Sequence, residues 1–463
     1  MNIPFKNSFL SWMMRKRIHQ IDFFRDNPNQ VQDKVFQSLI ENGKLTHFGA
    51  EHNFIEIDSY SDFTKKIPLR TYEQLFPYIE RIRKGEKDIL WPGEIKMFAK
   101  SSGTTNDRSK YIPISKESLK NCHFKGGRDM LSLYCNNFTN TNIFNGKGLM
   151  LGGSKESNTT FQFTDGDLSA LLIDNFPFWV NMHRVPDLET ALMKDWDKKL
   201  DMMCDQALNS NVTNITGVPS WMLVLFNRMI EKSGAKNILE IWPNLELFMH
   251  GGVNFGPYIN QFERFIPSEK MNYLEGYNAS EGFFGIQDQK NSKDLLLMLD
   301  YGIFYEFLPL SEYNKEEMNA IPLADVKLDE IYVLVISTNG GLWRYIIGDT
   351  IRFTSLNPYR IKVVGRTKSF LNSVGEELVV ENTEIAVEEC SLIHKCSISD
   401  YIATSIFVED GIAQHKWLVE FEIEPNSEKE FMKDVDKKLR EINSDYDAKR
   451  SEGYCLLPPE IIV

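Results

Sequence analysis

Residues 100–110 read KSSGTTNDRSK, in which positions 101–105 place one glycine among four hydroxyl residues, with Arg108 and Lys110 close behind. A loop of this composition can direct backbone N–H groups and hydroxyls at phosphate oxygens while the two cations neutralise them. The glycine lets the backbone approach a ligand closely. The Walker spacing GxxxxGK[ST] is absent, and an ordinary polar turn has the same composition. Alone, the stretch therefore leaves phosphate binding and a plain turn equally open.

Three further motifs follow along the chain. Residues 277–281 read YNASE, in which the ring can stack on a base and the carboxylate can hold Mg²⁺ on phosphates. Residues 344–349 read RYIIGD and end in an aspartate that can accept hydrogen bonds from a ribose diol. Residues 365–370 read GRTKSF. A surface turn or an edge strand explains each motif better when it is taken alone, but the ordered set indicates a nucleotide site.

The chain around these motifs predicts an α/β protein of two domains. Its 463 residues exceed one typical core. Apolar spacing predicts helices over 8–45 and 68–91, and short apolar runs before glycine-rich turns predict strands near 149–151, 245–249 and 331–337. After Gly365 a smaller α+β pattern follows, with helices over 381–395 and 427–443 and strands over 403–408 and 417–423. We therefore expect an N-terminal domain over 1–364 with mixed sheets and helices, and a small C-terminal domain over 365–463.

Composition narrows the classes of partner. The formal net charge of −13 argues against a basic nucleic-acid footprint. The six cysteines have no CxxC spacing and the eight histidines no HExxH pattern, which favours reduced thiols in a cytoplasmic protein without a zinc site. The apolar stretch Phe9 to Met14 precedes the basic cluster 15–17, which favours an amphipathic helix packed on the body over a signal peptide, and no run is long enough to span a membrane.

At this point the motif order SSGTT, YxxSE, RYxxGD and GRTK, with Asn372 and Gly375 after it, resembles that of the adenylate-forming enzymes. The residues within these motifs are most similar to those of the Gretchen Hagen family of acyl-acid amido synthetases. Three further stretches resemble bacterial members of that family, namely 91–94 (WPGE), 217–221 (GVPSW) and 250–253 (HGGV). The resemblance extends over nearly the whole chain and implies a large adenylate-forming domain followed by a small mobile domain.

The resemblance also implies roles for individual residues. It gives catalytic roles to Thr104, Lys110 and Glu281, a Mg²⁺ ligand role to Glu281 and the hinge between the domains to Lys368. The acyl pocket is expected at Trp221, Met222 and Val253, beside the motifs, although a packed helix over 221–226 explains the first two equally well. The expected nucleotide-binding residues are Ser101, Ser102, Gly103, Thr104, Thr105, Gly252, Tyr277, Ser280, Glu281, Asp349 and Arg366.

Two departures from the family pattern stand out. Where many adenylate-forming enzymes read YRxGD, this chain has an isoleucine after Tyr345, with Arg344 on the other side of that tyrosine. Family members continue past the position of Val463 for some tens of residues that carry a nucleotide-contacting lysine. We therefore expect the printed chain either to lack a tail or to be weak in the first half-reaction.

The expected activity is ATP-dependent, Mg²⁺-dependent activation of a small carboxylic acid as an acyl-adenylate, followed by transfer to the amine of an amino acid. Two alternatives stay open at the level of sequence. An acyl-CoA ligase shares the first half-reaction, and a non-catalytic adenylate-binding protein would keep the fold without turnover. The motifs do not separate amine from thiol acceptors, and they leave the acid and the oligomeric state undefined.

Overall fold

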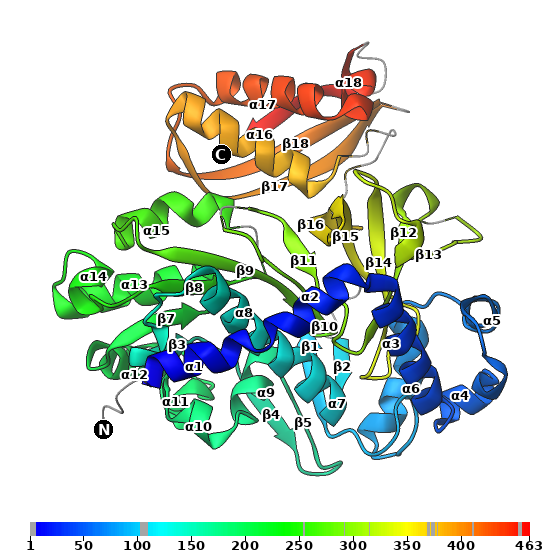
Figure 1. The fold of residues 1–463 in the computed structure, drawn as a ribbon. Coiled ribbons are helices and arrows are strands. Elements are labelled where there is room, and N and C mark those ends of the chain that lie inside the picture. Colours follow the sequence, from blue (N-terminus) through cyan, green and yellow to red (C-terminus); the bar gives the residue numbers. More distant parts are fainter. Residues whose placement is uncertain are drawn as a thin grey trace. The chain divides into compact units, whose positions relative to one another are not determined.

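A computed structural model describes the fold (Figure 1). The described residues are 6–101, 110–252, 255–290, 292–313, 315–367, 371, 376, 378–409, 412–451 and 456–463. The chain forms two compact units. The larger contains Met1–Ile347 and Arg352–Lys362, and the smaller contains Gly348–Ile351 and Val363–Val463. The α/β class expected from the sequence is confirmed in this architecture.

Two sheets organise the larger unit. A four-stranded sheet has the order β2 (Lys110–Ile114), β1 (Met97–Ser101), β5 (Phe163–Gly166), β4 (Lys155–Asn158). A twelve-stranded sheet, whose strands β15 and β16 also carry residues of the smaller unit, has the order β13 (Ile321–Pro322), β12 (Ile303–Pro309), β14 (Ile331–Thr338), β15 (Tyr345–Leu356), β16 (Tyr359–Arg366), β11 (Leu295–Leu297), β10 (Gly282–Ile286), β9 (Asn272–Ala279), β8 (Leu247–His250), β7 (Val212–Thr216), β3 (Lys147–Met150), β6 (Arg184–Val185).

Helices surround these sheets, and several begin at clear sequence signals. Ser59 and Asp62 form a capping box, and proline occupies the first turn of α3 and of α13. The helices of the larger unit are α1 (Lys6–Arg15), α2 (Ile18–Asp26), α3 (Pro28–Gly43), α4 (His47–Glu51), α5 (Tyr60–Lys66), α6 (Tyr72–Arg83), α7 (Lys116–Ser118), α8 (Phe124–Asn137), α9 (Leu168–Asp174), α10 (Phe178–Asn181), α11 (Leu188–Ala191), α12 (Trp196–Leu208), α13 (Pro219–Ser233), α14 (Ile238–Ile241) and α15 (Ile259–Phe265).

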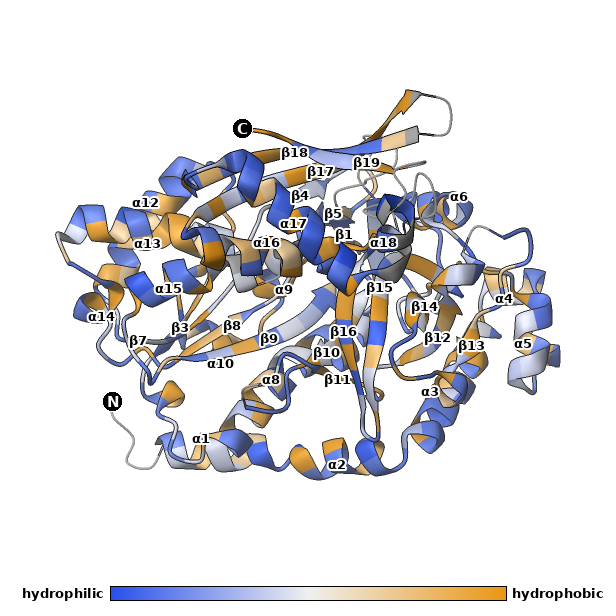
Figure 2. Cartoon of the chain, turned by 90° about the horizontal axis from the view of Figure 1, so that it is seen from above, coloured by the Kyte–Doolittle hydropathy of each residue, from blue (hydrophilic) through white to orange (hydrophobic). Residues whose placement is uncertain are grey.

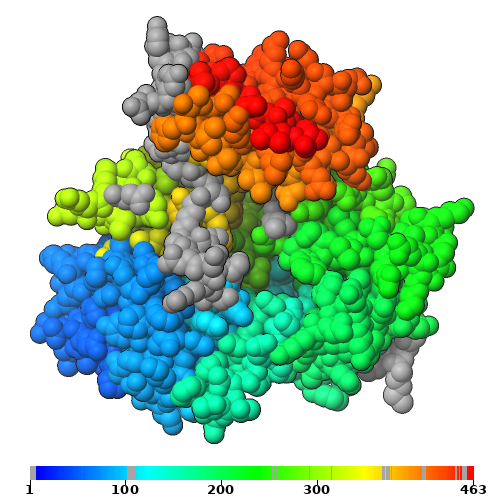
Figure 3. All heavy atoms as spheres, turned by 180° about the vertical axis from the view of Figure 1, so that it is seen from behind, coloured from blue at the N-terminus to red at the C-terminus, as the bar shows by residue number. Residues whose placement is uncertain are grey.

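A parallel segment of the large sheet carries an extensive apolar core. Strands β6, β3, β7, β8 and β9 are parallel neighbours, so their carboxyl ends meet at one edge. Helices α12, α13 and α15 bury apolar side chains against this segment. Phe226 of α13 and Phe262 of α15 pack with Phe248 of β8 in this core, and all three are fully inaccessible to solvent. In parallel α/β sheets ligands bind outside the carboxyl ends of the strands. In Figure 3 the blue N-terminal segments and the green segments near α12 to α15 form opposite sides of one face of this unit.

The smaller unit is an α+β fold. Its sheet has the order β17 (Ser397–Glu409), β18 (Ile412–Ile423), β19 (Leu456–Ile462). Helices α16 (Val380–His394), α17 (Glu428–Ile442) and α18 (Ser444–Ser451) accompany it. Along α17 the buried residues Phe431, Met432, Val435 and Leu439 recur at helical spacing, while the other residues, apart from the terminal Ile442, are hydrophilic (Figure 2). The helices expected over 381–395 and 427–443 are confirmed within one residue at each end, whereas the strands expected over 403–408 and 417–423 are present but begin earlier, at Ser397 and Ile412.

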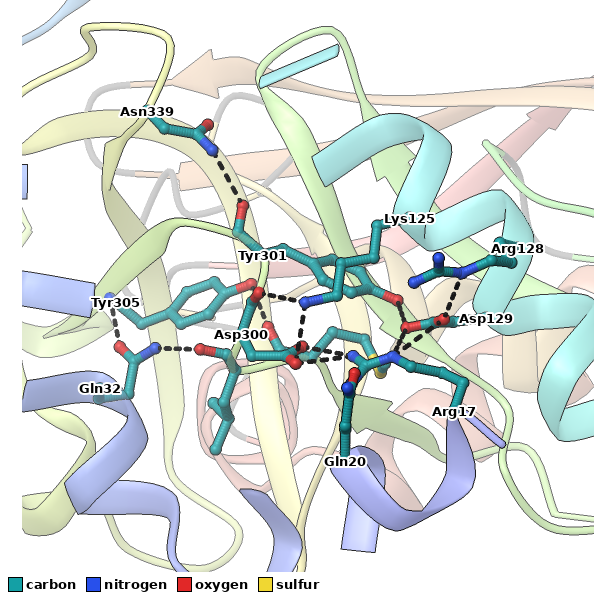
Figure 4. Close-up of polar contacts among 12 residues, drawn as sticks. Arg17, Gln20, Gln32, Lys125, Arg128, Asp129, Asp300, Tyr301, Tyr305 and Asn339 are labelled. Carbon is teal, nitrogen blue, oxygen red and sulfur yellow. Dashed lines mark hydrogen bonds and ion pairs between the residues drawn. The ribbon is translucent and has the colours of Figure 1, made fainter. Parts of the chain in front are cut away.

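A buried ionic network joins the N-terminal helices to the rest of the larger unit (Figure 4). Arg17, between α1 and α2, donates from Nε to Asp129 of α8 (2.9 Å) and from Nη2 to Asp300 (2.7 Å). The hydroxyl of Tyr301 donates to Asp129 (2.9 Å), and the Lys125 ammonium pairs with Asp300 (2.9 Å). The basic cluster after the first helix is thus partly interior, because Arg17 is 6% exposed.

Helix α1 packs along α8, as expected for an amphipathic helix on the body, but its apolar residues are not all inside. Phe9 and Trp12 are about half exposed, at 59% and 51%, whereas Ser11 and Met14 face the body. Among the described residues, no helix combines the length and the apolar character needed to cross a membrane.

Candidate functional site

The phosphate loop predicted from the sequence starts and ends on paired strands. Ser101 ends β1, Lys110 begins β2, and the two residues are register partners in the antiparallel pair. The loop between them is therefore anchored at adjacent points of one sheet. Of the residues expected to bind phosphate, Ser102, Gly103, Thr104 and Thr105 lie outside the described residues.

Three separated segments meet at a buried tyrosine. The Lys110 ammonium donates to the hydroxyl of Tyr345 (Nζ to Oη, 3.5 Å), and that hydroxyl donates to Glu281 (Oη to Oε1, 3.4 Å). Tyr345 is fully buried, and burial together with the Glu281 charge raises the pKa of its hydroxyl well above the usual value. The phenol therefore stays protonated and can bridge the cation and the carboxylate.

Sequence reasoning assigned roles to Lys110 and Glu281 but gave none to Tyr345. Tyr345 lies inside the RYIIGD motif, in which the aspartate at the end is the residue with an evident role in nucleotide binding. The hydroxyl becomes informative only when the fold brings β2, the 280–281 turn and the start of β15 together. Lys110 also lies over the ring of Tyr72, with 5.6 Å from Nζ to the ring centroid.

The YNASE motif forms the end of β9 and a tight turn. Ala279 pairs with Gly282 across the antiparallel strands, so Ser280 and Glu281 are the two turn residues. Tyr277 is 8% exposed and its ring packs against Phe284, with 4.9 Å between centroids. The turn presents Glu281 toward Tyr345, while the adenine contact of Tyr277 and the nucleotide contact of Ser280 stay predictions.

The two positions after β8 require glycine for different structural reasons. Gly252 has φ of +84°, in the left-handed region that favours glycine. A Cβ at Gly251 would collide with the carbonyl oxygen of Gly276 in β9. The chain thus turns tightly against the strand that leads into Tyr277, at the carboxyl edge of the parallel segment. Val253, expected in the acyl pocket, lies outside the described residues.

The other two residues expected in the acyl pocket have opposite surroundings, although both lie on α13. Trp221 is 46% exposed and meets Trp196 edge to face, with 4.3 Å between ring centroids. Met222 is fully buried in the core beside the parallel strands. The structure therefore favours the packed-helix alternative for Met222 and leaves Trp221 accessible to a ligand.

Asp349 and Arg366, both expected to contact the nucleotide, are brought together in the smaller unit. The Arg366 Nε donates to Oδ1 of Asp349 at 2.7 Å. The aspartate side chain is 6% exposed and the arginine side chain 52% exposed. Thr367 donates its backbone N–H to the carbonyl of Gly348 (2.8 Å), which holds the two segments side by side. Lys368, the expected hinge, lies outside the described residues.

Comparison with known protein families shows to which family the chain belongs. The chain matches the GH3 family N-terminal domain over residues 17–271, the GH3 family central domain over 296–366 and the GH3 family C-terminal domain over 381–463. The chain belongs to the GH3 family. The Gretchen Hagen resemblance read from the motifs is thereby confirmed.

Individual relatives agree with this assignment. The chain is similar to indole-3-acetic acid-amido synthetase GH3.4 of Arabidopsis thaliana, with 24% identity over 81% of this chain and 73% of the relative. It is also similar to jasmonoyl-L-amino acid synthetase JAR4 of Nicotiana attenuata, with 21% identity over 81% of this chain and 76% of the relative. As a GH3 protein, the chain is a ligase of the adenylate-forming, acyl-acid amido synthetase class, and this class uses ATP.

Solved structures show the same fold. The GH3.15 acyl acid amido synthetase has a TM-score of 0.78 at 17% identity and covers 96% of this chain and 88% of its own. A 2-hydroxyisobutyryl-CoA ligase in the postadenylation state has a TM-score of 0.59 at 10% identity and covers 93% and 84%. At such identities the likeness concerns the fold alone.

A buried histidine beside the site gives this GH3 protein a predictable response to acid. His250, the last residue of β8, stacks on Phe255 with 4.2 Å between ring centroids. Burial lowers its pKa to about 4. The unfolded chain, whose histidine pKa is about 6.5, binds the proton first, so stability falls as pH drops from 6.5 toward 4.

We expect this histidine to cost about 2 kcal/mol of folding free energy at pH 5 relative to pH 7. His250→Phe keeps an aromatic ring but cannot titrate, so its urea midpoint should change less between pH 7 and pH 5 than that of the parent. An unchanged pH dependence in the variant would contradict the buried, neutral state of His250.

Proposed function

We propose that this GH3 protein uses ATP and Mg²⁺ to activate a small carboxylic acid as an acyl-adenylate and then transfers the acyl group to the amine of an amino acid. The observation that carries the proposal is the contact of Lys110, Tyr345 and Glu281 beside the ends of the 102–109 loop. The bacterial-type branch, inferred from three motif stretches, and a cytoplasmic location, inferred from the cysteine pattern, belong to the same proposal.

The chemistry requires charge to be screened. A carboxylate oxygen of the acid attacks the α-phosphorus of ATP, and the bond to the pyrophosphate oxygen breaks. Both reactants are negative, so catalysis depends on positioning and on cations directed at the phosphates. Lys110 supplies a fixed cation, and Tyr345 holds it in line with the Glu281 turn. The amine nitrogen then attacks the acyl carbonyl, AMP leaves, and the nitrogen loses a proton.

The residues present fit a bound Mg²⁺. Glu281 offers the carboxylate oxygens that this ion prefers, and Mg²⁺ commonly binds proteins through one or two carboxylates while phosphates and water complete its shell. Among the residues that the structure describes, no group of three or more histidine, cysteine or carboxylate side chains forms a protein-only metal cage. When bound, the ion would neutralise charge on the phosphates. Glu281 would hold it, and Tyr345 would fix the orientation of that carboxylate.

Asp349 is the proposed ribose ligand. Removing a carboxylate that accepts from both ribose hydroxyls leaves them unpaired and costs about 1–3 kcal/mol. We therefore expect Asp349→Ala to weaken adenylate binding at least about tenfold. The loss of its 2.7 Å contact would also release Arg366, so Arg366→Ala is the matched variant. Calorimetry with ATP and with 2′-deoxy-ATP tests the assignment, and equal affinity of the parent for both nucleotides would refute it.

The experiment that tests the whole proposal is ATP–pyrophosphate exchange with a panel of carboxylic acids, including aryl and indolyl acids. Exchange that depends on one acid supports adenylation, and no exchange with any acid would favour a non-catalytic binding protein. A second stage offers the preformed adenylate to amino acids or to coenzyme A in single turnovers. Amide formation supports the proposed acceptor, while thioester formation alone would make the chain an acyl-CoA ligase.

Two finer parts of the proposal concern the acid and the second step. Trp221 and Val253 are proposed for the acyl pocket, whereas Met222 is buried in the core; Trp221 supports the proposal best because its side chain is half exposed. Movement of the small domain about Lys368 is proposed to separate adenylation from acyl transfer, since the two steps need different groups at one site. The proposed partners are thus a small carboxylic acid and an amino acid, without nucleic acid or membrane.

A further inference from the structure

The residue before Tyr345 has an unusual backbone. Arg344 has φ of +45°, in the left-handed region where a residue with a Cβ is strained. It lies directly before β15, so its conformation sets the direction in which the chain enters that strand and the point at which Tyr345 begins it. Such strain persists only where the surroundings over-determine it, and it concentrates at functional sites.

A buried bidentate salt bridge to Glu306 holds the Arg344 side chain in place. Its guanidinium makes a two-pronged contact with Glu306, with Nε 3.0 Å from Oε2 and Nη2 2.8 Å from Oε1. Nη1 donates to the carbonyl of Ile67 (2.7 Å), which follows α5. Arg344 is 5% exposed and Glu306 is fully buried, so water does not compete for these bonds. Planar two-pronged contacts of this kind fix orientation as well as charge.

Further hydrogen bonds hold the Arg344–Glu306 pair, which together with its hydrogen-bonding neighbours is called the clamp below. The Tyr60 hydroxyl donates to Glu306 (2.9 Å), and burial followed by the Glu306 charge raises the pKa of that hydroxyl, which keeps it a donor. The Arg344 N–H donates to Oγ of Ser337 (2.9 Å), and its carbonyl accepts from the N–H of Arg70 (2.9 Å). Both the side chain and the backbone of Arg344 are therefore fixed.

These contacts also answer a question raised by the sequence. The motif lacks the arginine found after the tyrosine in many adenylate-forming enzymes, and Arg344 is its neighbour. The Arg344 side chain is directed into the core at Glu306, so it does not stand in for a nucleotide-facing arginine. Arg344 is, however, the chain neighbour of Tyr345, so its position bears directly on where that residue lies.

We propose that Arg344 and Glu306 are positioning residues that hold Tyr345 between Lys110 and Glu281. This inference rests on the proposed function, in which Lys110 and Glu281 act on the nucleotide phosphates. The clamp fixes the backbone of Arg344, and the next residue then directs its hydroxyl at the two charged groups. A purely structural ion pair would stabilise the fold without affecting the Tyr345 hydroxyl.

The chain offers a matched control. Arg360 and Asp288 form a second buried two-pronged pair in the larger unit, with contacts of 2.9 and 2.7 Å. None of the contacts described for that pair reaches Lys110, Glu281 or Tyr345. Glu306→Gln and Asp288→Asn should each lower the Tm, but only Glu306→Gln should lower kcat for pyrophosphate exchange, by about tenfold. An equal loss of kcat in both variants would overturn the proposal.

A double-mutant cycle identifies the route of the effect. Tyr345→Phe removes the hydroxyl that the clamp is proposed to position. In that background Glu306→Gln should have little further effect on kcat, although its effect on Tm should remain. The same fold-loss of kcat in both backgrounds would show that Glu306 does not act through Tyr345. If Glu306→Gln does not fold, Tyr60→Phe removes one hydrogen bond from the same carboxylate and takes its place.

A spectroscopic measurement keeps this inference separate from the activity. With 3-fluorotyrosine placed at position 345, the fluorine resonance should shift or broaden in Glu306→Gln and stay unchanged in Asp288→Asn. An unchanged resonance in both variants would refute the positioning role whether or not the protein catalyses exchange. Absence of exchange in the parent with a normal shift would instead refute the proposed function alone.

Discussion

Replacing Glu281 by glutamine should lower kcat for ATP–pyrophosphate exchange by about 100- to 1000-fold, the range seen when one preorganised electrostatic group is removed from an active site. The substitution keeps the shape of the side chain and an oxygen that can accept a hydrogen bond from the Tyr345 hydroxyl. In the parent protein that hydroxyl lies 3.4 Å from Oε1 of Glu281. What it removes is the negative charge that is proposed to hold Mg²⁺. The exchange rate should be measured at saturating ATP across a range of Mg²⁺ concentrations.

The controls separate charge from packing. Glu281 lies in a two-residue turn, so Glu281→Gln should leave the Tm nearly unchanged. Tyr345→Phe removes the bridge to Lys110 without changing any charge and should reduce kcat less than Glu281→Gln does. A Glu281→Gln enzyme with kcat within threefold of the parent, at every Mg²⁺ concentration, would remove Glu281 from the catalytic machinery.

The fold was largely predictable where local signals were strong. Buried runs such as 331–337 and periodic segments such as 427–443 correspond to β14 and α17 within one residue at each end. Strand β19 was not predicted, because Pro458 and Pro459 interrupt its sequence and prolines are unfavourable inside a sheet. The two prolines are tolerated because β19 is an edge strand, which pairs with β18 alone.

Two charged residues of the candidate site stand out in the sequence, whereas the residues that contact or position them do not. Lys110 and Glu281 stand in recognisable motifs, and the structure brings them to the same tyrosine. The hydroxyl of Tyr345 gained meaning only through contacts with residues 64 and 235 positions away. The Glu306 partner of Arg344 is 38 positions away, in the middle of an apolar strand, where a lone glutamate has no sequence signal of its partner. Long-range pairing of this kind leaves no periodicity to read.

The ionic network around Arg17 also consists of contacts between residues far apart in the sequence, which no local pattern predicts. Its disruption is expected to cause the largest loss of stability. Arg17 contacts Asp129 and Asp300, which are 112 and 283 positions away (Figure 4). Breaking a buried pair from one side leaves an uncompensated charge and typically costs about 3–5 kcal/mol. We expect Arg17→Ala to lower the free energy of unfolding by that amount, measured by urea denaturation.

The exposed pair Arg228–Asp201 provides the comparison for Arg17. Both of its side chains are nearly half exposed, at 47% and 45%, and solvent screens such surface pairs so that they contribute little to stability. Arg228→Ala should therefore change the urea midpoint little. The combination Arg17→Met with Asp129→Leu should recover much of the loss, because apolar groups of similar volume can replace a buried ion pair.

The pH dependence gives the Arg17 prediction its sharpest form. Burial already raises the pKa of Asp129, and the Arg17 charge counteracts that rise. Without Arg17 the folded-state pKa should rise further, so the variant binds a proton at Asp129 that the unfolded chain, with a pKa of about 3.9, still releases. The deficit of Arg17→Ala relative to the parent should then be largest near pH 7 and shrink as the pH falls toward 4. A deficit below about 1 kcal/mol at pH 7, or one that grows on acidification, would mean that Arg17 does not compensate the buried Asp129 charge.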